Sequence, residues 1–258
     1  MNSNSIQSPL LRSRKSHFVK SNTIKKKKGI ENTNENQAFF SIVSHNIKNP
    51  FASLLGFTDL LFEDFDELND EERKYYLEEI KKSAQSTFNY TEKFFEWIYY
   101  RTGKIDFTFS DLNLRSCVEN TLLKIEKKYP EEKSISVNVD EFIEVRADED
   151  SLEKILFNLV ENAILFSKPN PVISIKAEKN NDKIKIIISD NGIGIKEEDL
   201  TKIFDLAKDP STIGESSYNG SGISLILIKE LVEQNNGTIH IESNFGEGSN
   251  VSFFLEGK

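Results

Sequence analysis

The chain has 258 residues, 37% hydrophobic and 29% charged, with a formal net charge of −9, which is the composition of an ordinary soluble protein of one large or two small domains. The single cysteine, Cys117, excludes an intrachain disulfide and a cysteine metal cluster, and no apolar run approaches the roughly 20 residues that span a bilayer. We therefore expect a cytoplasmic protein without a secretory signal.

The N-terminal segment is basic, whereas the rest of the chain is acidic. Residues 1–28 hold eight of the 33 basic residues and no acidic one, and they end in four consecutive lysines. The acidic body argues against nucleic acid as a partner, so membrane or nucleic-acid contact would have to come through the tail. A targeting peptide is a further alternative. We favour a solvated, disordered tail over residues 1–37, too short for a folded input domain.

Residues 38–103 carry two helical stripes of apolar residues. The first stripe begins near Phe39, and the second follows Asn69, which forms a capping-box pattern with Glu72. Gly103 is expected to end the second helix. Because a short acidic turn joins the two stripes, they predict an antiparallel helical hairpin. Two such hairpins in a homodimer would form a four-helix bundle.

From residue 104 the pattern changes to strands interspersed with helices. The expected strands span residues 105–109, 135–139, 172–177, 184–189, 238–243 and 249–255. The expected helices span residues 112–129, 148–166 and 221–234. This order favours helices on one face of a mixed sheet. The predicted fold class is therefore α+β: the helical hairpin, followed by an α/β sandwich domain.

Residues 44–50, within the first predicted helix, place His45 beside an apolar stripe and just before Pro50. A neutral imidazole is a good nucleophile at pH 7 and needs no strong base to activate it. Pro50 is expected to kink the helix after it. Taken alone, the segment fits a helix-surface histidine without chemistry about equally well.

Asn158 and Asn162 are four residues apart in the helix predicted over residues 148–166. Their amides therefore share one helix face, and an amide oxygen is a suitable ligand for Mg²⁺ that bridges phosphates. The alternative, favoured when this pair is considered alone, is that both amides face solvent.

The segment of residues 190–195 directly follows a predicted strand and contains Asp190, Gly192 and Gly194. A carboxylate at a strand end can accept a hydrogen bond from an exocyclic amine such as that of adenine, and glycines let backbone approach a flat ring. A hairpin turn is the alternative. Against it, residues 196–204 look helical rather than extended.

The segment of residues 220–225 leads into the last predicted helix. Glycines before a helix N-terminus offer N–H donors and a partial positive charge to phosphates. Gly220 and Gly222 fit that role, although a pair of glycines in an ordinary loop is also common.

Together, in this order, the four segments resemble the H, N, G1 and G2 boxes of the histidine kinases of two-component systems. Ile203 and Phe204 resemble the F box of that family, and residues 210–214 resemble its ATP lid. The resemblance extends from about Ala38 to the C-terminus.

The resemblance implies two domains and two cofactors. Residues 38–103 would be a dimerisation and histidine phosphotransfer hairpin. Residues 104–258 would bind ATP and Mg²⁺ in a domain of the type that gyrase and mismatch-repair ATPases share. His45 would attack the γ-phosphate and pass the phosphoryl group to an aspartate of a response regulator. Asn49 matches a position that can orient water to dephosphorylate that regulator.

By the same resemblance, Asp190 would bind the adenine amino group, with Gly192 and Gly194 lining the adenine pocket. Asn158 and Asn162 would serve the phosphates, with Asn162 as the Mg²⁺ ligand. The predicted nucleotide-binding residues of the G2 box are Gly220, Ser221, Gly222 and Leu225.

Three positions depart from the family pattern. Asn46 replaces an acidic residue, Leu165 a lysine and Ser224 a glycine. Loss of a general base typically costs about 10²–10⁴-fold in rate. We therefore predict a slow kinase. The alternatives are an ATP-binding pseudokinase and a phosphatase-biased scaffold that regulates a partner.

Overall fold

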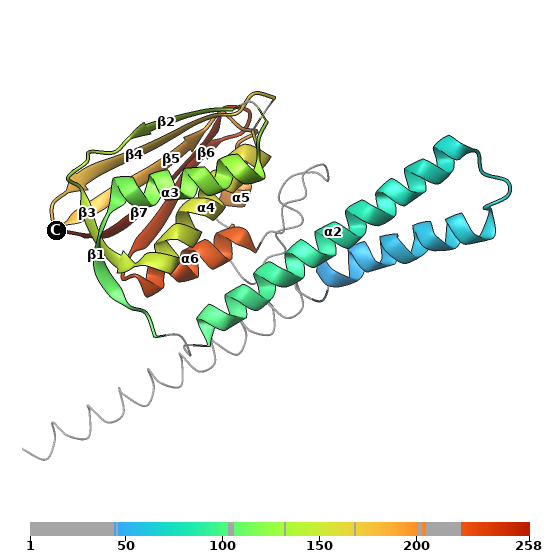
Figure 1. The fold of residues 1–258 in the computed structure, drawn as a ribbon, viewed down its shortest axis with the longest axis horizontal. Helices are drawn as coiled ribbons and strands as arrows, with labels where there is room; N and C mark the ends of the chain where they lie inside the picture. The colour runs from blue at the N-terminus through green and yellow to red at the C-terminus, as the bar shows by residue number, and fades with distance from the viewer. Residues whose placement is uncertain are drawn as a thin grey trace, which may run out of the picture.

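A computed structural model describes residues 44, 46–102, 106–131, 133–167, 169–200, 203–204 and 223–258 (Figure 1). The predicted disordered tail, residues 1–37, lies outside the described residues. The labelled elements are α2 Asp70–Arg101, β1 Phe109–Asn113, α3 Leu114–Lys128, β2 Ser134–Asn138, β3 Glu144–Asp148, α4 Glu149–Leu165, β4 Val172–Asn180, β5 Lys183–Asp190, α5 Glu197–Leu200, α6 Ser224–Gln234, β6 Thr238–Asn244 and β7 Gly248–Gly257.

The helical hairpin consists of residues 46–63, here called the acceptor helix, and α2 (Figure 1). The Asn69 side chain accepts hydrogen bonds from the N–H groups of Glu71 and Glu72, at 2.9 and 3.0 Å, and the Glu72 carboxylate accepts from the Asn69 N–H at 2.9 Å. This reciprocal cap starts α2 where the sequence predicts. Phe57 and Tyr76 face each other across the hairpin, with ring centroids 5.9 Å apart.

The seven strands form one mixed sheet in the order β1-β3-β7-β5-β4-β2, with β6 also paired to β7. Only the β2–β4 pair is parallel among the described strands. Helices α3, α4 and α6 cover one face of the sheet (Figure 1). The architecture confirms the predicted fold class, a helical hairpin followed by an α/β sandwich.

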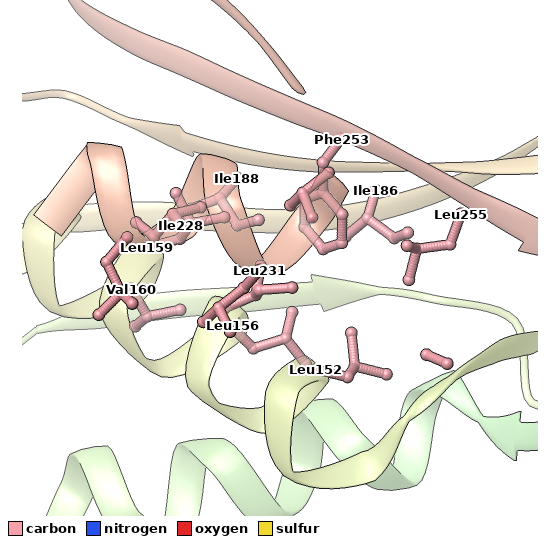
Figure 2. Packing of buried hydrophobic residues seen from close by; sticks show 14 of the residues in the cluster. Leu152, Leu156, Leu159, Val160, Ile186, Ile188, Ile228, Leu231, Phe253 and Leu255 are labelled. Atoms are coloured by element: carbon pink, nitrogen blue, oxygen red, sulfur yellow. The ribbon is translucent and has the colours of Figure 1, made fainter. Parts of the chain in front are cut away.

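The core lies between the sheet and these helices. Alternate residues of β5, among them Ile186 and Ile188, meet Phe253 of β7 on the covered face, and all three are essentially inaccessible to solvent. Figure 2 shows Leu156 of α4 and Leu231 of α6 pointing into the same layer. The buried side chains of the sheet and of the helices pack closely against each other in this layer. This packing fixes the positions of α4, β5 and α6, whose ends carry the candidate site residues.

Two boundaries at the start of the sheet domain differ from the sequence predictions. The strand expected over residues 105–109 is shifted, because β1 spans Phe109–Asn113 and pairs antiparallel with β3. Strand β3 itself was not predicted. The following helix, predicted from residue 112, begins at Leu114, because Asn113 caps α3 by accepting the N–H of Ser116 at 2.9 Å. The bounds of β1 are set by its pairing with β3, which is distant in the sequence. The local pattern of residues therefore could not predict where β1 begins and ends.

Within the described part of the chain, no helix combines the length and apolarity needed to cross a bilayer.

Candidate active site

Helix α4 positions the two predicted phosphate-site asparagines. Asp148 caps it by accepting the N–H of Ser151 at 2.9 Å. Asn158 is buried and donates through Nδ2 to the Lys154 carbonyl at 2.9 Å, which fixes its amide against the helix. Asn162 lies one turn further on and is partly exposed. The shared face that the spacing predicts is therefore present.

Glu161, directly before Asn162, is a buried carboxylate that the sequence analysis did not single out. It is 4% exposed and takes hydrogen bonds from Lys128 at 2.6 Å, Tyr129 Oη at 2.8 Å and Lys93 at 3.2 Å. Burial alone would raise the pKa of Glu161, but the donated hydrogen bonds and the charge of Lys93 outweigh it and leave that pKa lowered. The signal was available, because a carboxylate in the middle of an apolar helix implies a buried ion pair.

Asp190 ends β5 and has its carboxyl group oriented by the backbone. Its Oδ1 accepts the N–H of Gly192 at 2.8 Å and that of Ser249 at 3.2 Å. Burial raises the pKa of Asp190, although both N–H groups oppose that rise. Among the described residues no donor reaches Oδ2. The carboxyl group is thus pre-oriented, with one oxygen left for a ligand amine.

The two glycines after Asp190 are required by close backbone contacts. A Cβ on Gly192 would lie 2.6 Å from the Phe166 carbonyl oxygen, and a Cβ on Gly194 would lie 2.0 Å from that of Asn244. Gly194 also has a φ of +66°. The hairpin-turn alternative is wrong, because the chain continues from this segment into the short helix α5.

These contacts bring two of the predicted motifs together. The end of α4 meets the segment after β5 through a bridge between Ser167 and Gly192 and a 3.0 Å hydrogen bond from Ile193 N–H to the Phe166 carbonyl. Helix α6 begins at Ser224, two residues after Gly222. Leu225, a predicted nucleotide-binding residue, is partly buried and packs on the core. Leu165, at the last position of α4, is 41% exposed.

Other predicted residues lie outside the described ranges: His45, Gly220, Ser221, Gly222 and residues 210–214. Asn46 and Asn49 both belong to the acceptor helix; Asn46 is partly buried and Asn49 is exposed. This helix continues through Pro50 to residue 63. Ser224 is buried, and its Oγ accepts a hydrogen bond from Lys93 Nζ at 2.8 Å.

The arrangement suits a nucleotide whose adenine meets Asp190 and whose phosphates lie between α4 and the start of α6. Helix N-termini favour phosphate. Among the described residues, no group of three His, Cys, Asp or Glu side chains is placed to hold a metal. The amide of Asn162 nevertheless fits Mg²⁺, which is commonly bound by one or two protein oxygens together with substrate phosphates.

Family models match two consecutive parts of the chain. Residues 35–98 match the His Kinase A (phospho-acceptor) domain, and residues 147–258 match the histidine kinase-, DNA gyrase B- and HSP90-like ATPase.

Curated relatives include the sensor histidine kinase GacS of Pseudomonas protegens, 29% identical over 231 residues, covering 87% of this chain and 25% of that protein. The circadian input-output histidine kinase CikA of Synechococcus elongatus is 26% identical over 222 residues, covering 84% and 29%. The chain thus spans less than a third of the length of each of these two curated relatives.

Among solved structures, the histidine kinase ThkA in complex with the response regulator protein TrrA has a TM-score of 0.69 at 23% identity, covering 91% of this chain and 66% of that one. The Acinetobacter baumannii histidine kinase AdeS has a TM-score of 0.59 at 17% identity, covering 82% and 97%. At these identities the likeness is one of fold.

Proposed function

Because the chain belongs to the histidine kinases of two-component systems, we propose that it autophosphorylates His45 from ATP and passes the phosphoryl group to an aspartate of a response regulator. The observation that carries this proposal is the packing of the ATPase-type unit directly on α2, which pairs with the acceptor helix. An ATPase without a histidine acceptor would have no use for this hairpin.

In the proposed reaction the chain's own residues hold the nucleotide. Asp190 Oδ2 accepts the adenine amino group, while Asn158 and Asn162 face the phosphates, with Asn162 as the Mg²⁺ ligand. Gly220, Ser221, Gly222 and Leu225 complete the phosphate side. Bound Mg²⁺ would neutralise charge on the phosphates.

His45, which directly precedes the acceptor helix in the sequence, supplies the nucleophile. An imidazole nitrogen of His45 forms a bond to the γ-phosphorus, the bond from that phosphorus to the bridging oxygen breaks, and ADP leaves. Asn46 can orient the imidazole but cannot take its proton, so the proton passes to water and the step is slow. The exposed Asn49 would orient water when the regulator is dephosphorylated.

Apolar side chains left exposed on both hairpin helices support a homodimer. Phe51, Leu55 and Phe62 of the acceptor helix are 49%, 58% and 86% exposed. On α2, Phe88 and Phe95 are 58% and 62% exposed. Stripes of this kind bury in a four-helix bundle of two hairpins. The proposed domains are residues 38–103 for the hairpin and residues 104–258 for ATP binding.

The predicted cytoplasmic location and the absence of nucleic-acid partners rest on composition and on the proposed chemistry. The relatives named as kinases favour an active enzyme over the pseudokinase or phosphatase-biased alternative.

The test is incubation of the full chain with γ-labelled ATP and Mg²⁺. We expect acid-labile label on the wild-type protein and none on His45→Ala. His240→Gln, at an exposed position of β6, is the matched histidine control and should keep the label. Persistent label on His45→Ala would refute the acceptor assignment. Absence of label on the wild type, with ATP binding intact, would refute the proposed kinase activity.

A further inference from the structure

The second half of α2 is the surface on which the ATP-binding unit docks. Phe94 and Trp97 are 9% and 4% exposed and belong to the same buried cluster as the core of α4 and α6. Arg101 pairs with Glu230 of α6 at 3.3 Å and lies over the Trp97 ring, 5.1 Å from its centroid. This interface therefore has an apolar centre with ionic contacts around it.

Lys93 connects three helices at the edge of this interface. Its Nζ donates to Ser224 Oγ at 2.8 Å and to Glu161 Oε2 at 3.2 Å, so α2 is tied to the first residue of α6 and to α4. Glu161 directly precedes Asn162, and Ser224 stands where the family usually has glycine. A glycine would have no side chain to accept from Lys93, so this contact depends on the residue in which the chain departs from its family.

The position of Lys93 along the hairpin places these contacts close to Asn46, at the start of the acceptor helix. Phe57 and Tyr76 lie at the same level of the antiparallel hairpin. Counting eleven residues from each toward the open end of the hairpin reaches Asn46 on the acceptor helix and Thr87 on α2, so these two residues also share a level. Lys93 is therefore only six residues, roughly 9 Å, beyond the level of Asn46. Helical side chains lean toward the N-terminus of their own helix. Because the two helices are antiparallel, the Lys93 side chain leans toward the level of Asn46 and the Asn46 side chain leans toward the level of Lys93, so the distance along the hairpin is shorter than about 9 Å between their side chains. Ile47 also packs on the buried cluster that includes Phe94.

We propose that Lys93 is a positioning residue for phosphoryl transfer, which holds α4 and the start of α6 beside the acceptor helix through Glu161 and Ser224. This inference rests on the proposed kinase function and deepens it. Phosphoryl transfer requires the reacting atoms to approach within about 3–3.5 Å, so a contact that fixes the nucleotide site relative to the acceptor acts on turnover rather than on ATP affinity. Ser224 is then an anchor and not a defect.

The kinetic test uses the full chain with Lys93→Met, Ser224→Ala and the double variant. Each single variant should lower kcat for autophosphorylation about tenfold and leave the KM for ATP within about twofold. Ser224→Ala removes one charge-assisted hydrogen bond that joins α2 to the ATP-binding unit, and Lys93→Met removes two. The double variant should be no slower than the slower single one. Lys82→Met, which removes an exposed α2 lysine paired with Glu79, is the control and should be unchanged.

A second measurement monitors the docking of the ATP-binding unit on α2 directly. Trp97 is the only tryptophan and is buried in the interface, so acrylamide quenching of its fluorescence reports separation of the ATP-binding unit from α2. Lys93→Met and Ser224→Ala should increase quenching, and Lys82→Met should not.

Unchanged or increased kcat in the single variants, additive effects in the double variant, or unchanged quenching would each overturn the inference. A wild-type protein that never labels His45 would refute the proposed function instead, and the quenching series would still decide whether Lys93 holds the interface.

Discussion

Asn235, at the end of α6, accepts the backbone N–H of Asp148 through its Oδ1 at 2.9 Å and so joins α6 to the first turn of α4. Its Nδ2 also donates to Ser151 Oγ at 2.7 Å and to the Leu231 carbonyl at 2.8 Å, and the residue is 1% exposed. One buried amide therefore ties together the two helices on which the candidate nucleotide site is built.

Replacing Asn235 with Leu should lower the free energy of unfolding by about 2–4 kcal/mol, because it leaves buried polar groups on α4 without their hydrogen-bond partner. Urea denaturation of the two proteins measures the difference. Asn120→Leu, at an exposed position of α3, is the control, expected within about 0.5 kcal/mol of wild type. Equal stability of Asn235→Leu and wild type would mean that the bridge contributes nothing.

Gly194→Ala should destabilise the fold strongly, since the added Cβ would meet the Asn244 carbonyl oxygen at 2.0 Å. Gly246 offers a matched comparison, because it also has a positive φ, +88°, but open space around the Cβ position. Gly246→Ala should cost about 1 kcal/mol and Gly194→Ala at least twice as much in thermal or urea unfolding. The reverse order would contradict the close approach.

Asp190→Asn should weaken ATP binding about 10- to 100-fold, because the charged acceptor for the adenine amine is lost while the fold is retained. Isothermal titration calorimetry measures the dissociation constant. Asp182→Asn, in the exposed β4–β5 turn, should bind ATP as wild type does. If Asp190→Asn also kept full affinity, adenine recognition would have to lie elsewhere.

Glu161→Gln should cost about 3 kcal/mol of stability at pH 7, since it breaks a buried ion-pair cluster. The pKa of Glu161 is lowered in the folded protein, so its ionised form contributes stability that is complete above pH 4.5, the ordinary glutamate value. That contribution is lost as the pH falls through the lowered pKa. The gap between the two unfolding curves should therefore close in acid.

The control for this pH series is Glu153→Gln, whose partly exposed carboxylate pairs with Lys124. It should cost under about 1 kcal/mol at any pH. A pH-independent gap for Glu161→Gln would show that lost packing and not lost charge is responsible.

Asn46→Asp should raise the autophosphorylation rate about tenfold or more by restoring a base beside the acceptor histidine. Initial rates with labelled ATP measure it. Asn120→Asp adds the same charge on α3 and should have no effect. No gain in Asn46→Asp would mean that the amide is not what limits the rate.

The sequence predicted the features that local chemistry controls. The Asn69–Glu72 pair set the start of α2, and the alternating isoleucines of β5 identified a strand with Asp190 at its end. Helical spacing placed Asn158 and Asn162 on one face of α4. The fold class and the family follow from such patterns taken in order. The chemical roles of all the predicted site residues stay predictions, and four of those residues, His45, Gly220, Ser221 and Gly222, lie outside the described part of the chain.

Tertiary structure alone decided which distant residues meet. Lys93 reaches Glu161, 68 residues away, and Ser224, 131 residues away, and no periodicity connects these positions. The same holds for β1, whose register exists only through β3, and for Gly194, which is glycine because Asn244 lies against it. Local propensity fixes helices and caps through neighbours within a few residues, whereas buried ion pairs and close backbone contacts arise only when packing brings separate elements together.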